Sequence, residues 1–112
     1  MEASKLHVRS VGQGPTVVLL HSSGSSGRQW EGLTTALQSR YRLHALDLHG
    51  HGSTPAWASG ERMRLEDDLA LMEPLLRSNA PVHVVGHSYG GALALKLATL
   101  MPERIASVVV YE

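Results

Sequence analysis

The sequence predicts an α/β fold with a mostly parallel sheet flanked by helices. Short β-type runs alternate along the chain with segments of helical periodicity, an order typical of βαβ units. The run Thr16–Leu20 is almost wholly apolar, as expected for a parallel strand buried on both faces. A second β-type run, Val82–Val85, leads into Gly86-His87-Ser88-Tyr89-Gly90 and then into an alanine- and leucine-rich segment. We therefore expect one α/β domain over residues 1–112.

The remaining elements follow from periodicity and turn residues. A strand is expected over 6–11, closed by the turn Gly12-Gln13-Gly14-Pro15. After the strand 16–20 we expect a glycine- and serine-rich loop at 22–27, a helix at 28–38, a strand at 41–46, a loop at 47–58, a helix at 61–76, strands at 81–85 and 105–111, and a helix at 89–100 between them. Pro74 removes one internal hydrogen bond, so the helix at 61–76 should kink or end early. The helix expected at 28–38 has apolar residues at helical spacing, so we expect these side chains to lie in the core: Trp30, Leu33 and Leu37.

Composition excludes several functional classes. The 112 residues carry 10 basic and 10 acidic side chains, so no net field favours nucleic acid or an anionic membrane as a partner. The lack of cysteine excludes disulfides, thiolate nucleophiles and cysteine metal sites. Residues 1–5 lack the apolar region of a signal peptide, and no segment approaches the roughly 20 apolar residues that span a bilayer. These features predict a soluble, cytoplasmic protein and leave its oligomeric state open.

The segment Gly86-His87-Ser88-Tyr89-Gly90 has the pattern G-x-S-x-G between an expected strand and an expected helix. In such a turn the serine backbone is held in an unfavourable conformation, and its hydroxyl stands clear of the sheet. Gly86 and Gly90 leave room for the turn, because a Cβ there would collide with neighbouring backbone. Ser88 could instead merely cap the helix, but the glycines on both sides favour a nucleophile.

With three further segments, this pattern resembles the α/β-hydrolase superfamily. Val17–Gly24 resembles the strand and His-Gly-type loop that supplies half of the oxyanion hole, and Asp47–Ser53 is similar to the D-x-x-G-x-G-x-S loop. Pro102–Tyr111 resembles the strand after the nucleophile helix. The four matches occur in the family's order and cover nearly the whole chain. The resemblance implies a partial α/β-hydrolase fold, an incomplete domain that lacks the distal acid and histidine and whose last strand presents a bare edge.

The resemblance also implies a serine hydrolase that acts, without a cofactor, on an ester or related acyl bond of a small molecule. Ser88 would attack the carbonyl, and the backbone N–H groups of Tyr89 and Ser23 would hold the oxyanion. Ser22 stands where the family usually has glycine. Glu112 ends the strand after the nucleophile helix, where some family members place the triad acid, although the commoner site lies one strand later.

Other polar residues near these motifs are expected to support or line the pocket. His21 should brace its loop by hydrogen bonding rather than act as a general base, and Asp47 should cap loop N–H groups rather than serve as the triad acid. His87 should line the pocket or support a residue that does, rather than act as the base, because neighbouring residues at an elbow project in different directions. His21 and Ser22 are also expected to line the pocket. Trp57 could line the pocket or merely anchor its loop.

A metal site and a nucleotide site have little support. His49-Gly50-His51 lacks the third and fourth ligands that zinc needs, so we expect a glycine-shaped loop and no metal. No G-x-G-x-x-G and no P-loop lysine are present. Three alternatives to an active acyl hydrolase remain open: a catalytically inactive hydrolase fold that binds a ligand, a cofactor-free haloperoxidase-like enzyme, and an incomplete translation product.

Overall fold

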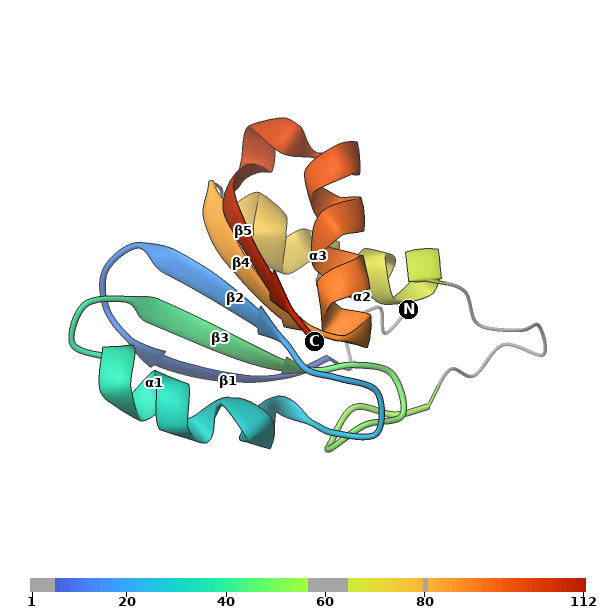
Figure 1. The fold of residues 1–112 in the computed structure, drawn as a ribbon, viewed down its shortest axis with the longest axis horizontal. Coiled ribbons are helices and arrows are strands. Elements are labelled where there is room, and N and C mark those ends of the chain that lie inside the picture. The colour runs from blue at the N-terminus through green and yellow to red at the C-terminus, as the bar shows by residue number, and fades with distance from the viewer. Residues whose placement is uncertain (1–5, 57–64, 80) are drawn as a thin grey trace.

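The computed structural model describes residues 6–56, 65–79 and 81–112, and these form one five-stranded sheet with helices on both faces (Figure 1). The strands are β1 (His7–Gly12), β2 (Thr16–Leu20), β3 (Arg42–Asp47), β4 (Val82–His87) and β5 (Ile105–Tyr111). The helices are the 3₁₀-helix η1 (Gly27–Trp30), α1 (Glu31–Leu37), α2 (Leu65–Asn79), α3 (Tyr89–Leu100) and the 3₁₀-helix η2 (Pro102–Arg104).

The sheet has the strand order β1-β3-β2-β4-β5 and is mostly parallel, as the sequence predicts. β1 alone runs antiparallel, to its neighbour β3, whereas β2 pairs in parallel with β3 and β4, and β4 with β5. The carboxyl ends of β2 to β5 therefore meet at one edge of the sheet. The loops after β2, β3 and β4 come together there, which is where ligands bind in open α/β sheets.

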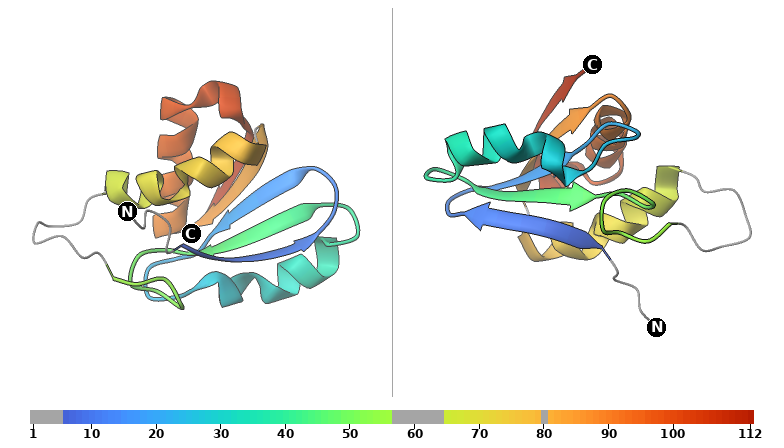
Figure 2. Two further views of the ribbon diagram at one scale, coloured as in Figure 1. Left: turned by 180° about the vertical axis from the view of Figure 1, so that it is seen from behind. Right: turned by 90° about the horizontal axis from the view of Figure 1, so that it is seen from below.

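The sheet divides the core into two apolar layers. Figures 1 and 2 show the helices that cover the two faces of the sheet. Val17 and Leu19 of β2 face the layer of η1 and α1, and the alternate residues Val18 and Leu20 face the layer of α2 and α3. β2 is thus buried on both faces, as its apolar sequence predicts. Trp30, 3% exposed, lies in the first layer, so its predicted core position is confirmed.

Two helices depart from the sequence prediction. The helix expected at 28–38 forms as η1 followed by α1, and α2 continues through Pro74 to Asn79. Of the two alternatives expected at Pro74, the early end is therefore wrong, and the kink stays a prediction. Met72 and Leu76, on either side of Pro74, are fully buried, and their packing holds the helix together across the lost hydrogen bond. The start expected at residue 61 lies outside the described residues.

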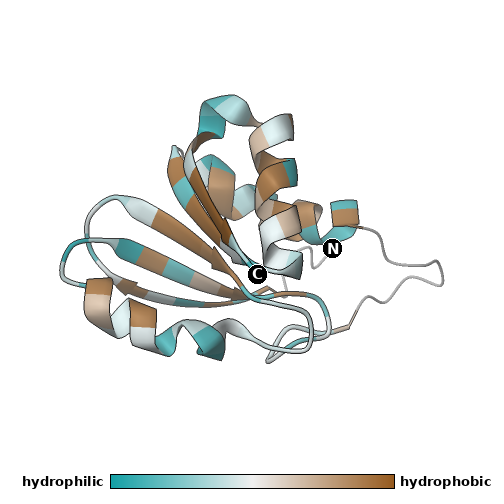
Figure 3. Cartoon of the chain, viewed as in Figure 1, coloured by the Kyte–Doolittle hydropathy of each residue, from teal (hydrophilic) through white to brown (hydrophobic). Residues whose placement is uncertain are grey.

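Large apolar side chains are exposed at the β5 edge of the sheet. They belong to α3 and β5, where Figure 3 shows apolar ribbon at the end of the sheet: Leu95, Leu100, Val109, Val110 and Tyr111. This agrees with the bare apolar edge that the sequence predicts for the last strand. Of the helices in the described ranges, none is both long enough and apolar enough to cross a bilayer.

Candidate active site

Ser88 occupies the turn between β4 and α3 in a strained backbone conformation. Its φ of 56° and ψ of −112° make it the one non-glycine residue with a positive φ among those described. The conformation is held by backbone hydrogen bonds: the N–H of Ser88 donates to the Tyr111 carbonyl (2.9 Å), and its own carbonyl accepts from Gly91 (2.8 Å) and Ala92 (3.1 Å). The serine side chain is exposed at the loop edge of the sheet.

The flanking glycines are sterically required. A Cβ on Gly86 would lie 2.2 Å from the carbonyl oxygen of Gly90, and a Cβ on Gly90 would lie 2.1 Å from the carbonyl oxygen of Leu20. Both distances are far inside van der Waals contact, and in each case the obstacle is backbone. The expected room for a tight turn is therefore confirmed. These close approaches bring the start of α3 directly against the end of β2.

The loop after β2 places two serines beside this turn. The Ser22 N–H donates to Oε1 of Gln29 (2.9 Å), and the Ser22 hydroxyl donates to the same oxygen (3.3 Å). Gly24 donates its N–H to Nε2 of His51 (3.1 Å). Between them Ser23 is exposed, and within the described residues neither its N–H nor that of Tyr89 donates to a protein acceptor. Ser22, at the position where the resemblance leads us to expect glycine, has no positive φ.

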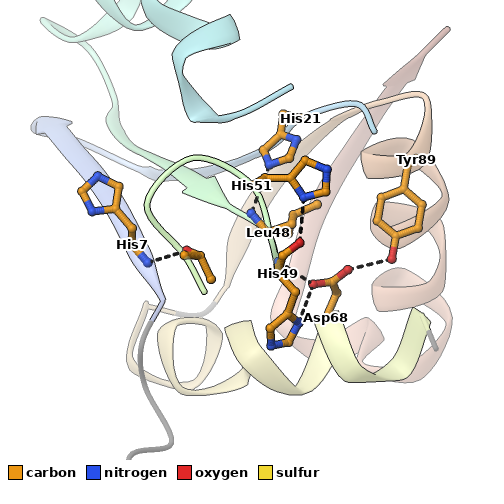
Figure 4. Close-up of polar contacts among 8 residues, drawn as sticks. His7, His21, Leu48, His49, His51, Asp68 and Tyr89 are labelled. Carbon is orange, nitrogen blue, oxygen red and sulfur yellow. Dashed lines mark hydrogen bonds and ion pairs between the residues drawn. The ribbon is translucent and has the colours of Figure 1, made fainter. Parts of the chain in front are cut away.

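His21 links this loop to the loop after β3. The Leu48 N–H donates to Nε2 of His21 (3.0 Å; Figure 4), so Nε2 is unprotonated. The other ring nitrogen, Nδ1, donates to the Ser22 carbonyl (2.7 Å). Burial lowers the pKa of His21, which favours this neutral form. Both ring nitrogens are committed to hydrogen bonds, so no free lone pair is left for general base chemistry. The geometry agrees with the expected bracing role.

Asp47, at the end of β3, caps backbone N–H groups. Its carboxylate accepts from Gly27 (2.7 Å) and from Ser53 (2.9 Å). Burial raises the pKa of Asp47, but the N–H donors of Ser53 and Gly27, together with the nearby His7 and His21, bring the pKa below its usual value. The predicted capping role is confirmed.

Asp68, a residue that the motif reading missed, anchors Tyr89. Its carboxylate is 1% exposed and accepts from the Tyr89 hydroxyl (2.7 Å) through one oxygen and from the backbone N–H of His49 (3.1 Å) through the other, which also lies 2.9 Å from Nδ1 of His49 (Figure 4). Burial, followed by this hydrogen bond, raises the pKa of Tyr89. A sequence signal existed: Asp68 falls three residues after Leu65 and four before Met72, on the apolar stripe of α2, where a carboxylate needs partners.

The histidines of the loop after β3 are used in hydrogen bonds. His51 accepts the Gly24 N–H at Nε2, so its Nδ1 carries the proton and donates to the His49 carbonyl (2.7 Å). The rings of His51 and His21 lie 4.9 Å apart. Across the described ranges, no three histidine, aspartate or glutamate side chains gather in a way that could hold a metal ion.

The remaining candidate residues are His87, Glu112 and Trp57, and the structure describes the first two. His87 stacks on Tyr111, with ring centroids 4.8 Å apart, and its Nδ1 lies 2.9 Å from Nε2 of Gln29. Glu112 is exposed directly after Tyr111, so it lies at the loop edge beside Ser88, and its role as an acid stays a prediction. Trp57 lies outside the described residues. Within the part of the chain that the structure describes, no histidine forms a hydrogen bond with the Ser88 hydroxyl.

Comparisons with known proteins agree with this architecture. The family model "Alpha/beta hydrolase family" matches residues 17–112. A pimeloyl-[acyl-carrier protein] methyl ester esterase of Aeromonas hydrophila is 39% identical over 104 residues, which are 91% of this chain and 39% of that protein. The esterase of the same name from Nitrosomonas europaea is 33% identical over 108 residues, 95% of this chain and 40% of that protein.

Solved structures give the same result. An epoxide hydrolase of Vigna radiata superposes with a TM-score of 0.87 at 30% identity, over 94% of this chain and 35% of that one. A thioesterase domain from the curacin biosynthetic pathway superposes with a TM-score of 0.86 at 26% identity, over 94% of this chain and 41% of that one. The chain spans about two fifths of the length of the curated relatives that it matches. With a family match over most of its residues, the chain belongs to the alpha/beta hydrolase family.

Proposed function

We propose that this chain carries the nucleophile of a serine hydrolase that acts on an ester or a related acyl bond. The observation that carries the proposal is the conformation of Ser88, whose exposed side chain stands on a strained turn fixed by backbone bonds on both sides. Strain of this kind persists where the surrounding structure enforces it, and it gathers at functional sites. A hydroxyl nucleophile suits acyl transfer, and the curated relatives are named as esterases.

In the proposed reaction, Oγ of Ser88 attacks the carbonyl carbon of the ester while a base takes the hydroxyl proton. The negative charge that forms on the carbonyl oxygen is held by the N–H groups of Tyr89 and Ser23, aided by the positive end of the α3 dipole. Collapse of this intermediate expels the alcohol, and water then releases the acid from the serine. Preorganised donors of this type stabilise a transition state by about 3 to 4 kcal/mol each.

The base is proposed to lie outside the described histidines. His21 has both ring nitrogens bonded, and His87 accepts from Gln29 rather than from the serine. The relatives are about two and a half times as long as the matched segment, since it covers 39 to 40% of them. We therefore assign the base to a histidine outside residues 1–112. Glu112 remains a candidate for the acid that orients it.

The substrate class is proposed from the relatives. Their printed name describes the methyl ester of an acyl group on an acyl-carrier protein, so a methyl ester with a carrier-bound acyl chain is the first substrate to test. The reaction is proposed to need no cofactor and to take place in the cytoplasm.

The test uses two proteins, the 112-residue chain and the longest natural protein that contains it. Each is treated with a fluorophosphonate, and the mass of the intact protein is then measured. We expect the longer product to gain one phosphonyl adduct, Ser88→Ala to gain none, and the matched variant Ser39→Ala, at an exposed serine outside the site, to react like the wild type. Saturable ligand binding that Ser88→Ala leaves unchanged, with no labelling of any form, would identify an inactive binding fold and refute the nucleophile.

A further inference from the structure

We infer that Gln29 is a positioning residue that ties the oxyanion loop to the nucleophile turn. This inference rests on the proposed function. Gln29 belongs to η1, between β2 and α1, and no sequence motif points to it. Its carboxamide lies between two segments that are distant in sequence, the loop at Ser22 and the end of β4 at His87.

The chemistry of the partners fixes the orientation of the amide. The Ser22 N–H can only donate, so the atom 2.9 Å away must be the carbonyl oxygen of Gln29, and the Ser22 hydroxyl donates to the same oxygen. The NH₂ group therefore faces Nδ1 of His87 at 2.9 Å. Because NH₂ can only donate, this nitrogen must be unprotonated, and neutral His87 carries its proton on Nε2.

The hydrogen bonds of Gln29 to Ser22 and to His87, here called the Gln29 bridge, begin where the backbone pairing of β2 with β4 stops. The parallel ladder between β2 and β4 ends at Leu20 and Gly86, so it fixes the two strands but not the residues that follow them. Gln29 joins the next segments through Ser22 and His87, each of which directly precedes a proposed catalytic group, the Ser23 N–H and the Ser88 hydroxyl.

The His87 ring, at one end of the Gln29 bridge, is also held in place by β5. The His87 ring stacks on Tyr111, with the ring planes inclined by 15°, and the Tyr111 carbonyl accepts the Ser88 N–H. The imidazole is thus fixed between Gln29 and β5, and it cannot rotate without losing one of these contacts. Gln29 thereby ties the loop that carries the Ser23 donor to the nucleophile turn, while His21 holds the Ser22 carbonyl of that loop and Asp68 holds the Tyr89 side chain. A shift of about 1 Å between such groups is enough to slow a reaction severely.

The experiment compares three variants. Gln29→Met keeps the length of the side chain but forms neither hydrogen bond. Gln29→Glu keeps an acceptor for the Ser22 N–H but has no donor for neutral His87. Gln38→Met, at an exposed glutamine just after α1, is the matched control. Nitrogen NMR of the 112-residue chain reports the His87 tautomer and the Ser22 amide, and phosphonylation of the longest natural product reports the rate at Ser88.

We expect the wild type to show His87 protonated on Nε2. In Gln29→Met the His87 and Ser22 signals should both move, and the limiting phosphonylation rate should fall about tenfold with the half-saturating probe concentration within twofold of the wild type. In Gln29→Glu only His87 should change strongly, with a smaller loss of rate. Gln38→Met should match the wild type throughout.

The outcomes separate this inference from the proposed function. Unmoved His87 and Ser22 signals in Gln29→Met would overturn the bridge, whatever the rates. Moved signals with a wild-type rate would overturn the positioning role while the nucleophile stands. If the wild type itself is not labelled, the proposed function fails and the positioning role with it, although the NMR comparison still measures the bridge.

Discussion

Lowering the pH from 7.5 to 5.5 should destabilise this fold through two buried histidines. His21 is fully buried and bonded through both ring nitrogens. His44, in β3, is 6% exposed, with Nδ1 2.7 Å from the Ser10 hydroxyl. Burial lowers the pKa of His21, and burial together with the charge of Arg42 lowers that of His44, both from an ordinary value of 6.5.

The sign and size follow from proton linkage. As the pH falls below 6.5, the unfolded chain takes up a proton at each histidine, whereas the native state takes it up only at a lower pH. The stability is therefore complete above 6.5 and declines as the pH falls toward the native pKa values. If a histidine stays neutral in the native state over this whole range, the free energy of unfolding falls by about 1.4 kcal/mol between pH 7.5 and 5.5. The two together set an upper limit of about 2.7 kcal/mol, a large part of the 5–15 kcal/mol that typically stabilises a domain.

The assay is urea unfolding followed by far-ultraviolet circular dichroism at constant ionic strength. His21→Asn and His44→Gln should each be less stable at pH 7.5 because they lose native contacts. Each should also show a pH dependence reduced by up to half, which isolates these sites from the other histidines. A free energy of unfolding that is flat across the range, or an NMR titration of His21 above pH 6.5, would refute the reasoning.

Three further predictions concern packing and the site. Gly90→Ala should lower the free energy of unfolding by about 3 kcal/mol or more, because the added Cβ meets backbone atoms. Gly32→Ala, which has open space around it in α1, should instead raise the free energy of unfolding by about 0.5–1 kcal/mol. Equal urea midpoints for the two variants would contradict this prediction. Tyr89→Phe removes a hydroxyl donor from the buried carboxylate of Asp68 and should cost about 1.5–3 kcal/mol by thermal unfolding, an expectation that an unchanged melting temperature would rule out. Val109, on β5, has a side chain that is 54% exposed, and Val109→Lys should reduce the fluorescence of a dye that binds exposed apolar surface. Undiminished fluorescence would show that the dye binds an apolar surface elsewhere.

The sheet and the nucleophile turn could be predicted because their signals are local. An apolar run such as Thr16–Leu20 is compatible only with burial on both faces, and Gly86 and Gly90 mark a turn that excludes a Cβ. The early helix end expected at Pro74 was wrong for the opposite reason, whereas the kink expected as its alternative stays a prediction. Proline removes one internal hydrogen bond from the helix, but tertiary packing around it decides where the helix ends.

Gln29 and Asp68 could not be found from motifs, because their meaning lies in partners far along the chain. Gln29 contacts His87, and Asp68 contacts Tyr89, and these partners lie 58 and 21 residues further along the chain. Asp68 left a trace as a charge on an apolar helix stripe. Gln29 left none, since a polar residue in a short 3₁₀ segment is ordinary.

The loops of this site show how irregular backbone is satisfied without a sheet ladder. Backbone N–H groups near the protein interior need acceptors, and side chains at the loop edge supply them: His21, His51 and Asp47 all accept from loop N–H groups. The histidine-rich sequence thus serves structure more than proton transfer. Within the described residues this pairing leaves the N–H groups of Ser23 and Tyr89 without protein acceptors. Donors that are held in place by neighbours yet unpaired themselves are what the proposed oxyanion hole requires, because they meet developing charge without first breaking another hydrogen bond.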